Sequence, residues 1–91
     1  MTDSWIGPGA IVDKSIIDKN VVVGAQAMVG TGTDYDTPNT LQPDKVNTGI
    51  NVIGKGARIP ANSIIGRNVV INAERTESQF PFTNIASGST I

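Results

Sequence analysis

Five cationic side chains have the types and spacing to do chemistry together. They are Lys14, Lys19, Lys55, Arg58 and Arg67. Lys19 and Lys55 hold the same position in a repeating six-residue unit, so a fold that stacks these units places both ammonium groups on one edge. Clustered cations and turn amides bind phosphate oxygens well. We therefore predict a site for an anionic effector, such as a sugar phosphate, and keep a solubilising edge as the alternative interpretation.

Two pairs of carboxylates are candidates for acid-base or metal chemistry. Asp13 and Asp18 stand where other units carry glycine, and we interpret them as corner residues that accept hydrogen bonds from nearby amides. Asp34 and Asp36 lie in a polar segment with too few fixed oxygens for a calcium site, so we interpret them as part of a solvated loop. The sequence therefore predicts no catalytic, cofactor-binding or metal-ligating residue.

The composition excludes several classes of chemistry. The chain has no histidine, which removes the general base of acyltransferases and the zinc ligands of carbonic anhydrases built on six-residue repeats. It has no cysteine, so disulfides and thiolate metal sites are excluded. The glycine pairs at 7–9 and 30–32 lack the Gly-Lys-Ser/Thr sequence of a phosphate loop.

The charge and hydropathy of the chain limit the classes of partner that it is expected to bind. A formal charge of −1, without aromatic residues interleaved in a basic run, predicts no nucleic-acid partner. No segment approaches the roughly 20 apolar residues of a membrane span. The first residues, Met1–Trp5, lack the basic and apolar regions of a signal peptide. We therefore predict a cytoplasmic protein without a membrane partner.

An aliphatic residue recurs at intervals of six along much of the chain. Aliphatic-glycine pairs begin at Ile6, Val23, Val29, Ile53 and Ile65. A period of six fits neither a helix nor simple strand alternation, so each unit must contain a short strand and a corner. Glycine or asparagine often follows three residues later, where a corner needs positive φ, and a small or β-branched residue follows four residues later. The pattern predicts an all-β parallel β-helix with two inward residues per unit.

The repeat also predicts which core residues stack. On a three-sided prism about three coils tall, each face is filled by one column of Val and Ile. The columns are Ile6, Val23 and Ile59; Val12, Val29 and Ile65; and Ile17, Ile53 and Ile71. The unit between Val12 and Ile17 is one residue short, so one corner must be tighter than the others.

With 91 residues the chain is predicted to form a single β-helix domain. We expect coils at about 6–30 and 52–73, an inserted loop at about 31–51 and a C-terminal cap at 74–91. A hidden extra coil between Val29 and Ile53 is arithmetically possible, because the gap is a multiple of six. Its inward positions would be Tyr35, Leu41 and Asn47, and two of these three fit poorly.

The two ends of the coil stack are expected to differ. Phe80 and Phe82 would cover one end, whereas Trp5 alone precedes the first core residue at the other. Terminal coils expose unpaired backbone and apolar side chains unless something covers them. The N-terminal end is therefore expected to meet another domain or subunit, and self-association into a homo-oligomer is predicted.

Several short sequence motifs, taken in order, resemble those of the C-terminal β-helix domain of bacterial glucose-1-phosphate adenylyltransferase, the ADP-glucose pyrophosphorylase of glycogen synthesis. The sharpest match is Ile-Ile-Asp-Lys-Asn at 16–20, which follows Ile-Gly-Pro-Gly-Ala at 6–10. Thr-Pro-Asn at 37–39, Asn-Thr-Gly-Ile at 47–50 and Ile-Gly-Arg-Asn at 65–68 support it. The resemblance implies a left-handed helix, because the spacing of the repeat does not determine the hand.

The resemblance also implies a role. In that family the β-helix is a non-catalytic domain for oligomerisation and allosteric regulation, and its partners are an N-terminal catalytic domain, other subunits and sugar-phosphate effectors. The parent enzyme joins ATP and glucose 1-phosphate into ADP-glucose and pyrophosphate with magnesium, through a catalytic domain that this chain does not contain. Two alternatives stay open: a domain of another sugar nucleotidyltransferase, or a standalone transferase or scaffold of six-residue repeats.

Overall fold

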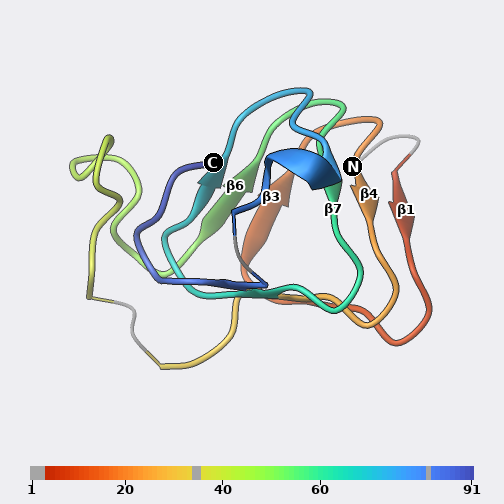
Figure 1. Ribbon diagram of the computed structural model, residues 1–91. Helices are drawn as coiled ribbons and strands as arrows, with labels where there is room; N and C mark the ends of the chain where they lie inside the picture. Colours follow the sequence, from red (N-terminus) through yellow and green to blue (C-terminus); the bar gives the residue numbers. More distant parts are fainter. Residues whose placement is uncertain (1–3, 34–35, 82) are drawn as a thin grey trace.

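The computed structural model describes residues 4–33, 36–81 and 83–91, which wind into a three-sided parallel β-helix (Figure 1). The strands are β1 (Trp5–Ile6), β2 (Ile11–Val12), β3 (Ser15–Ile17), β4 (Val22–Val23), β5 (Met28–Val29), β6 (Asn51–Ile53), β7 (Arg58–Ile59), β8 (Ile64–Ile65), β9 (Val70–Ile71) and β10 (Asn84–Ile85). A 3-10 helix, η1 (Glu77–Gln79), follows β9. The prediction of an all-β parallel β-helix is confirmed, and its left-handed winding stays a prediction from the resemblance.

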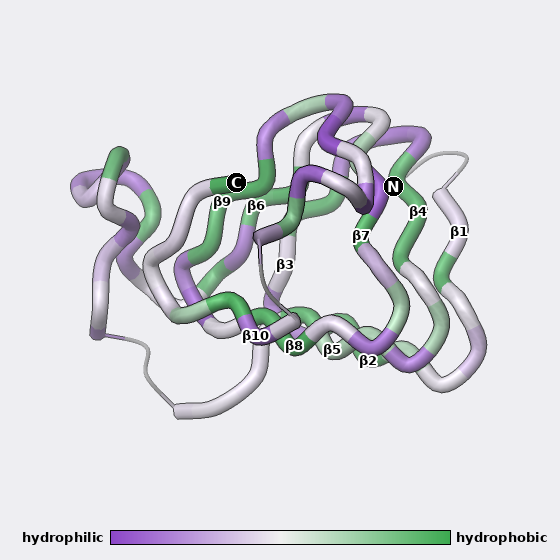
Figure 2. The backbone as a smooth tube through the Cα atoms, in the orientation of Figure 1, coloured by the Kyte–Doolittle hydropathy of each residue, from purple (hydrophilic) through white to green (hydrophobic). Residues whose placement is uncertain are grey.

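Each side of the helix is a parallel sheet built from successive coils. The first sheet has the order β1-β4-β7, the second β2-β5-β8-β10 and the third β3-β6-β9. In Figure 2 the strands of the second sheet lie side by side along the lower edge of the molecule. The predicted columns are the observed ones, because the register pairs Ile6 with Val23 and Val23 with Ile59. The same agreement holds for the columns of the other two sheets.

The inward positions form one narrow aliphatic core. Four isoleucines, at 53, 59, 65 and 71, are at most 1% exposed. The second inward position of each unit carries a smaller residue, such as Val21, Ala27 or Ser63, and these side chains are buried too. β-Branched residues suit this arrangement, because they pack well on a pleated surface. The core is therefore filled by alternating large and small side chains, as the repeat predicts.

The corners use the backbone conformation that the sequence indicates. Asn20, Asn62 and Asn68 have φ values of 59°, 63° and 56°, in the left-handed region that asparagine tolerates better than most residues. The one-residue-short unit turns at Lys14, where φ is 45°. This corner is the tighter one that the sequence requires.

The inserted segment between β5 and β6 forms no strand among its described residues. It is held to the coils by Asn39, whose side chain is fully buried. The Asn39 Nδ2 group donates to the carbonyl oxygens of Asn68 and Ser89 at 3.1 and 3.0 Å. Its Oδ1 atom accepts from the amides of Leu41 and Gln42. The loop is therefore tied to the third coil and to the C-terminal segment, and its described residues form no hidden coil.

Two further asparagines complete this attachment. Asn68 Oδ1 accepts from the Gly49 amide at 2.7 Å, at the end of the loop. Asn51 Nδ2 donates to the Gly66 carbonyl, and Asn51 Oδ1 accepts from the Val69 amide. Buried amide side chains must be hydrogen-bonded to avoid a large desolvation cost. These asparagines satisfy that requirement while they anchor the insertion where it returns to the coils.

The C-terminal segment, expected as a cap, also continues the coil stack. β10 pairs with β8, and Thr90 forms a single bridge with Val70 of β9. Phe80 and Ile91 pack against the core from this end, whereas Phe82 lies outside the described residues. The longer corner that contains η1 hides the six-residue period here, which is why the sequence pattern does not predict the added strand.

The N-terminal end of the stack is open among the described residues. Ile6, Val12 and Ile17 are only half-buried, although the residues below them in each column are fully buried. Together with Ser15 and Ile16 they line a hollow of about 650 Å³. This end therefore presents apolar side chains to whatever lies against it.

Two glycines allow a direct test of how tightly the coils approach. Gly30 and Gly32 have similar φ values of 86° and 82°, so alanine at either position carries the same backbone strain of about 1–2 kcal/mol. A Cβ at Gly30 would also collide with the Asp13 carbonyl oxygen, whereas a Cβ at Gly32 would meet nothing within 4 Å.

We expect Gly30→Ala to lower the free energy of unfolding by about 1–3 kcal/mol more than Gly32→Ala, because the neighbouring backbone must shift. Urea unfolding followed by circular dichroism measures both losses. Equal losses would show that the coils are not packed this closely.

Candidate functional site

The strongest cluster of cations lies on the edge where the third sheet turns into the first. Lys19 follows β3 and Lys55 follows β6, and both side chains are exposed. The Gly56 amide donates to the Lys19 carbonyl oxygen at 3.1 Å, so the two corners are stacked in adjacent coils. The spacing between such coils is about 4.8 Å. The structure thus places the two lysines as neighbours on one edge, in the arrangement that the sequence predicts.

Arg58 and Arg75 add two guanidinium groups near this edge. Arg58 begins β7, and its amide donates to the Arg75 carbonyl oxygen at 2.8 Å, so Arg75 lies in the next coil. The Nε atom of Arg75 is buried and has no hydrogen-bond partner among the described residues. Arg75 therefore holds a buried, unused donor in the coil beyond Arg58.

Sequence reasoning missed Arg75 because it fell in the expected cap. Counting the six-residue unit from Ile71 places Arg75 in the inward column that contains Val21 and Ala57. The backbone hydrogen bonds confirm this position. The Arg58 amide donates to the Arg75 carbonyl oxygen in the same way as the Val22 amide donates to that of Ala57. A charged residue at an inward position was the signal that could have found it.

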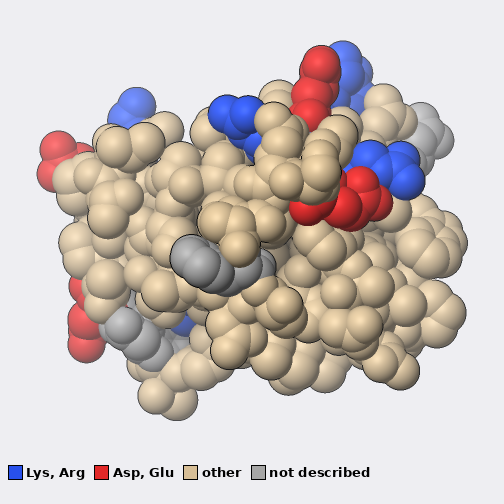
Figure 3. Space-filling view, in the orientation of Figure 1, with Lys and Arg blue, Asp and Glu red and all other residues tan. Residues whose placement is uncertain are grey.

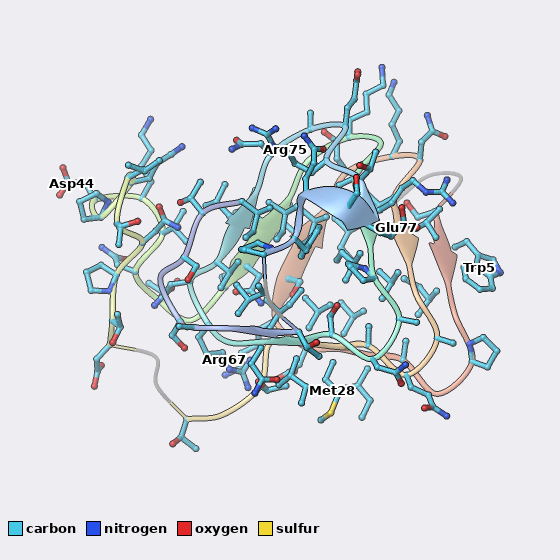
Figure 4. All side chains as sticks on the ribbon, in the orientation of Figure 1. Trp5, Met28, Asp44, Arg67, Arg75 and Glu77 are labelled. Atoms are coloured by element: carbon cyan, nitrogen blue, oxygen red, sulfur yellow. The ribbon has the colours of Figure 1, made fainter. Side chains whose placement is uncertain are left out.

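Arg58 is partly neutralised by a carboxylate from η1. Its Nε atom lies 3.3 Å from Glu77 Oε2, and both side chains are about half exposed. A hydrogen bond from its own backbone amide, and then the Arg58 guanidinium, hold the pKa of the Glu77 carboxyl below its usual value. Arg75 and Glu77 are labelled on the upper side of the helix in Figure 4, where Figure 3 shows blue and red groups side by side.

The other two predicted site residues lie away from this edge. Lys14 precedes β3 and Lys19 follows it, so these lysines stand at opposite ends of one strand. Arg67 is only 5% exposed, and its Nη1 atom lies 2.9 Å from Asp13 Oδ2. Its Nε atom donates to the Gly32 carbonyl oxygen at 3.1 Å. Arg67 is thus engaged in holding the start of the inserted loop, and the five cations do not form one site.

The carboxylates are also dispersed. Asp13 and Asp18 flank β3 at its two ends, and Asp18 Oδ1 accepts from the Lys19 amide at 2.7 Å, as expected of a corner residue. Asp36 is exposed in the inserted loop, and Asp34 lies outside the described residues. Within the described ranges, no group of three or more acidic residues could hold a metal ion. The part of the chain that the structure describes has no helix long and apolar enough to cross a membrane.

The fold and the repeat define this chain as a parallel β-helix of six-residue units. No family model and no solved structure matches it. It is 52% identical over 91 residues to a glucose-1-phosphate adenylyltransferase from Thermomicrobium roseum, and 38% identical over the same length to one from Acetivibrio thermocellus. Each match covers 100% of this chain and 21% of the relative, so the chain spans about a fifth of their length.

A third enzyme of that name, from Ruminiclostridium cellulolyticum, is 36% identical over 56 residues, or 62% of this chain and 13% of the relative. This chain is therefore a homologue of the glucose-1-phosphate adenylyltransferases, and it corresponds to their C-terminal β-helix domain. The resemblance noted in the sequence is confirmed.

The buried Arg67 provides a stability test. We expect Arg67→Met to lower the free energy of unfolding by about 1.5–3 kcal/mol, because the Gly32 carbonyl oxygen loses a charged hydrogen-bond donor. Arg58→Met is the matched control, since its exposed ion pair contributes about 0–1 kcal/mol. Urea unfolding at low and high salt distinguishes the two. A loss at Arg67 no larger than that at Arg58 would contradict a structural role for the buried Arg67 side chain.

Proposed function

We propose that this chain is a non-catalytic assembly and regulatory domain of a glucose-1-phosphate adenylyltransferase. The observation that carries the proposal is similarity along the entire chain to relatives of that name. In this proposal the rest of the enzyme joins ATP and glucose 1-phosphate into ADP-glucose and pyrophosphate for glycogen synthesis. The magnesium ion belongs to that catalytic part, and the enzyme works in the cytoplasm as a homo-oligomer.

The N-terminal end of the β-helix is the surface that we assign to the catalytic part. The half-buried side chains of Ile6, Val12 and Ile17 leave the core open there. Burial of apolar area contributes about 25 cal/mol per Å², so covering this end stabilises both partners. A domain seated on the first coil would also pair with the backbone groups of its strands.

The lysine edge is the surface that we assign to an anionic effector. Lys19 and Lys55 lie on adjacent coils, and both side chains are exposed. Phosphate oxygens accept charge-assisted hydrogen bonds from such groups. The proposed set is therefore Lys19, Lys55 and Arg58, without Lys14 and Arg67, which lie away from this edge.

A segment exchange tests the assembly role. In this test the chain replaces the matching segment of the Thermomicrobium roseum enzyme. We expect the exchanged enzyme to form ADP-glucose at a rate within about tenfold of that of the parent enzyme, because the core columns are compatible. The same enzyme without the segment is the control and should lose activity. An exchanged enzyme that folds as judged by circular dichroism but is as inactive as the truncated control would refute the proposal.

Calorimetric titration of the chain tests the effector role. Fructose 1,6-bisphosphate, fructose 6-phosphate, glucose 1-phosphate, ATP and AMP are the ligands. We expect saturable binding of at least one, weakened about a hundredfold or more when Lys19→Ala and Lys55→Ala are combined, because each charged hydrogen bond contributes about 1.5–3 kcal/mol. Combined Lys14→Ala and Lys45→Ala changes the net charge equally and should leave affinity unchanged. Equal effects in both variants would indicate nonspecific attraction.

A further inference from the structure

The inserted loop reaches past the coil next to it and contacts the last coil of the stack. We call residues 36–50 of this loop the clasp, and residues 84–91 the last coil. The loop leaves the second coil after β5, and the Thr40 amide in the clasp donates to the Gly88 carbonyl oxygen of the last coil at 2.9 Å. In Figure 1 the yellow-green clasp lies beside the dark blue C-terminal segment. The clasp therefore connects two coils that are not adjacent in the stack.

The contact between the clasp and the last coil is buried and closely packed. Asn39 of the clasp is fully buried, and its Nδ2 group donates to the Ser89 carbonyl oxygen at 3.0 Å. The Thr90 hydroxyl donates in turn to Asn39 Oδ1 at 3.1 Å. Gly88 has a φ of 85°, and a Cβ there would lie 2.6 Å from the Pro38 carbonyl oxygen. Both side chains and backbone of the clasp are thus fitted to the last coil.

The last coil has little regular structure of its own to hold it in place. Its strand β10 has two residues, and Thr90 adds a single bridge to Val70. The terminal repeat of a stack contacts one neighbour and frays first. Nevertheless Ile85 is only 5% exposed and stacks on Ile65. Burial this complete under so short a strand indicates that the clasp supplies part of the order of the last coil.

The clasp depends on the last coil in the same way. Asn39 Oδ1 accepts from the amides of Leu41 and Gln42, and these bonds fix the shape of the clasp but not its position. Its position depends on Asn39 Nδ2, which donates to Asn68 in the third coil and to Ser89 in the last coil. Removal of the last coil would take away one of these acceptors and let water compete for the other. A buried amide that loses its partners carries a large desolvation cost.

We propose that the clasp and the last coil open and close as one unit, and that the first three coils stay folded when this unit opens. Such local unfolding units are common in proteins, and the stabilisation within them is reciprocal. Opening would lift Ile85 from Ile65 and Ile91 from the core, so the C-terminal end of the stack would become apolar and open. The unit is therefore a conformational switch between a covered and an uncovered end. It does not rest on the function proposed above.

Amide hydrogen exchange of the unmodified chain, followed by NMR at several low urea concentrations, tests the proposal. The reporting amides are hydrogen-bonded: Thr40 and Gly49 in the clasp, and Gly88 and Ile91 in the last coil. All four should show one free energy of opening and one urea dependence, both smaller than those of the Gly24 amide in the second coil. Different opening free energies for the two segments would overturn the proposal.

Asn39→Asp separates the position of the clasp from its shape. The carboxylate still accepts from the amides within the clasp, but it no longer donates to the two coils. Exchange of Gly88 and Ile91 should become about thirtyfold faster or more, with Gly24 unchanged. Asn47→Asp is the matched control, because Asn47 is exposed and its Nδ2 group donates to the Pro43 carbonyl oxygen within the clasp. It should leave exchange in the last coil unchanged.

Gly88→Ala tests the coupling from the other side. Its Cβ would press on the Pro38 carbonyl oxygen, so exchange of Thr40 and Gly49 in the clasp should become about tenfold faster or more. Gly32→Ala is the control, because its φ of 82° carries the same backbone strain without a close contact, and it should leave both amides unchanged.

Two results would overturn the proposal. In the first, each variant speeds exchange only in its own segment, so the clasp and the last coil open separately. In the second, Asn39→Asp speeds exchange of Gly24 as much as that of Gly88, so the opening is global. If Asn39→Asp does not fold, as judged by circular dichroism, the unmodified chain and Gly88→Ala decide the question.

Discussion

The whole structure depends on one constraint: each coil must lie directly on the next, with their backbones hydrogen-bonded in register. The Gly7 amide donates to the Val23 carbonyl oxygen, and the Gly24 amide donates to that of Ile59, at 2.8 and 2.9 Å. Since every side of the prism obeys the same register, an inward side chain in one coil falls on an inward side chain in the next. A shift by one residue would turn the apolar columns outward.

This constraint explains how the helix tolerates a long insertion. The chain leaves the stack after β5 and returns at β6 to complete the same coil, so the loop need only keep the distance between the two ends of one corner. Buried asparagines pair with the polar groups that the insertion would otherwise leave unpaired: Asn39 in the loop, Asn68 in the third coil and Asn51 at the point of return. Loop-closure entropy grows only slowly with length, so such an insertion costs little once its ends are fixed.

The same constraint decides what the sequence could predict. Columns and corners were predictable, because Ile6, Val23 and Ile59 repeat at intervals that only stacked coils satisfy, and the stacked Lys19 and Lys55 follow from the same count. The contact between Arg67 and Asp13 was not predictable. These residues are 54 positions apart, and they meet because the arginine side chain is long, not because the six-residue period aligns them. Strand β10 was not predictable either, because the corner that contains η1 interrupts the six-residue period.

The Arg67–Asp13 ion pair joins two coils that are not adjacent in the stack. Asp13 belongs to the first coil and Arg67 to the third, and the guanidinium passes over Gly30 of the second coil, where a Cβ would lie 3.1 Å from Nη1. Repeat proteins usually unfold as chains of nearest-neighbour interfaces, so their terminal repeats fray first. A tie between the first and third coils adds a next-nearest-neighbour coupling, and the N-terminal coil then gains its order from two partners. Fraying of that end must then break its tie to the third coil as well as its contacts with the second, which couples the two ends of the stack.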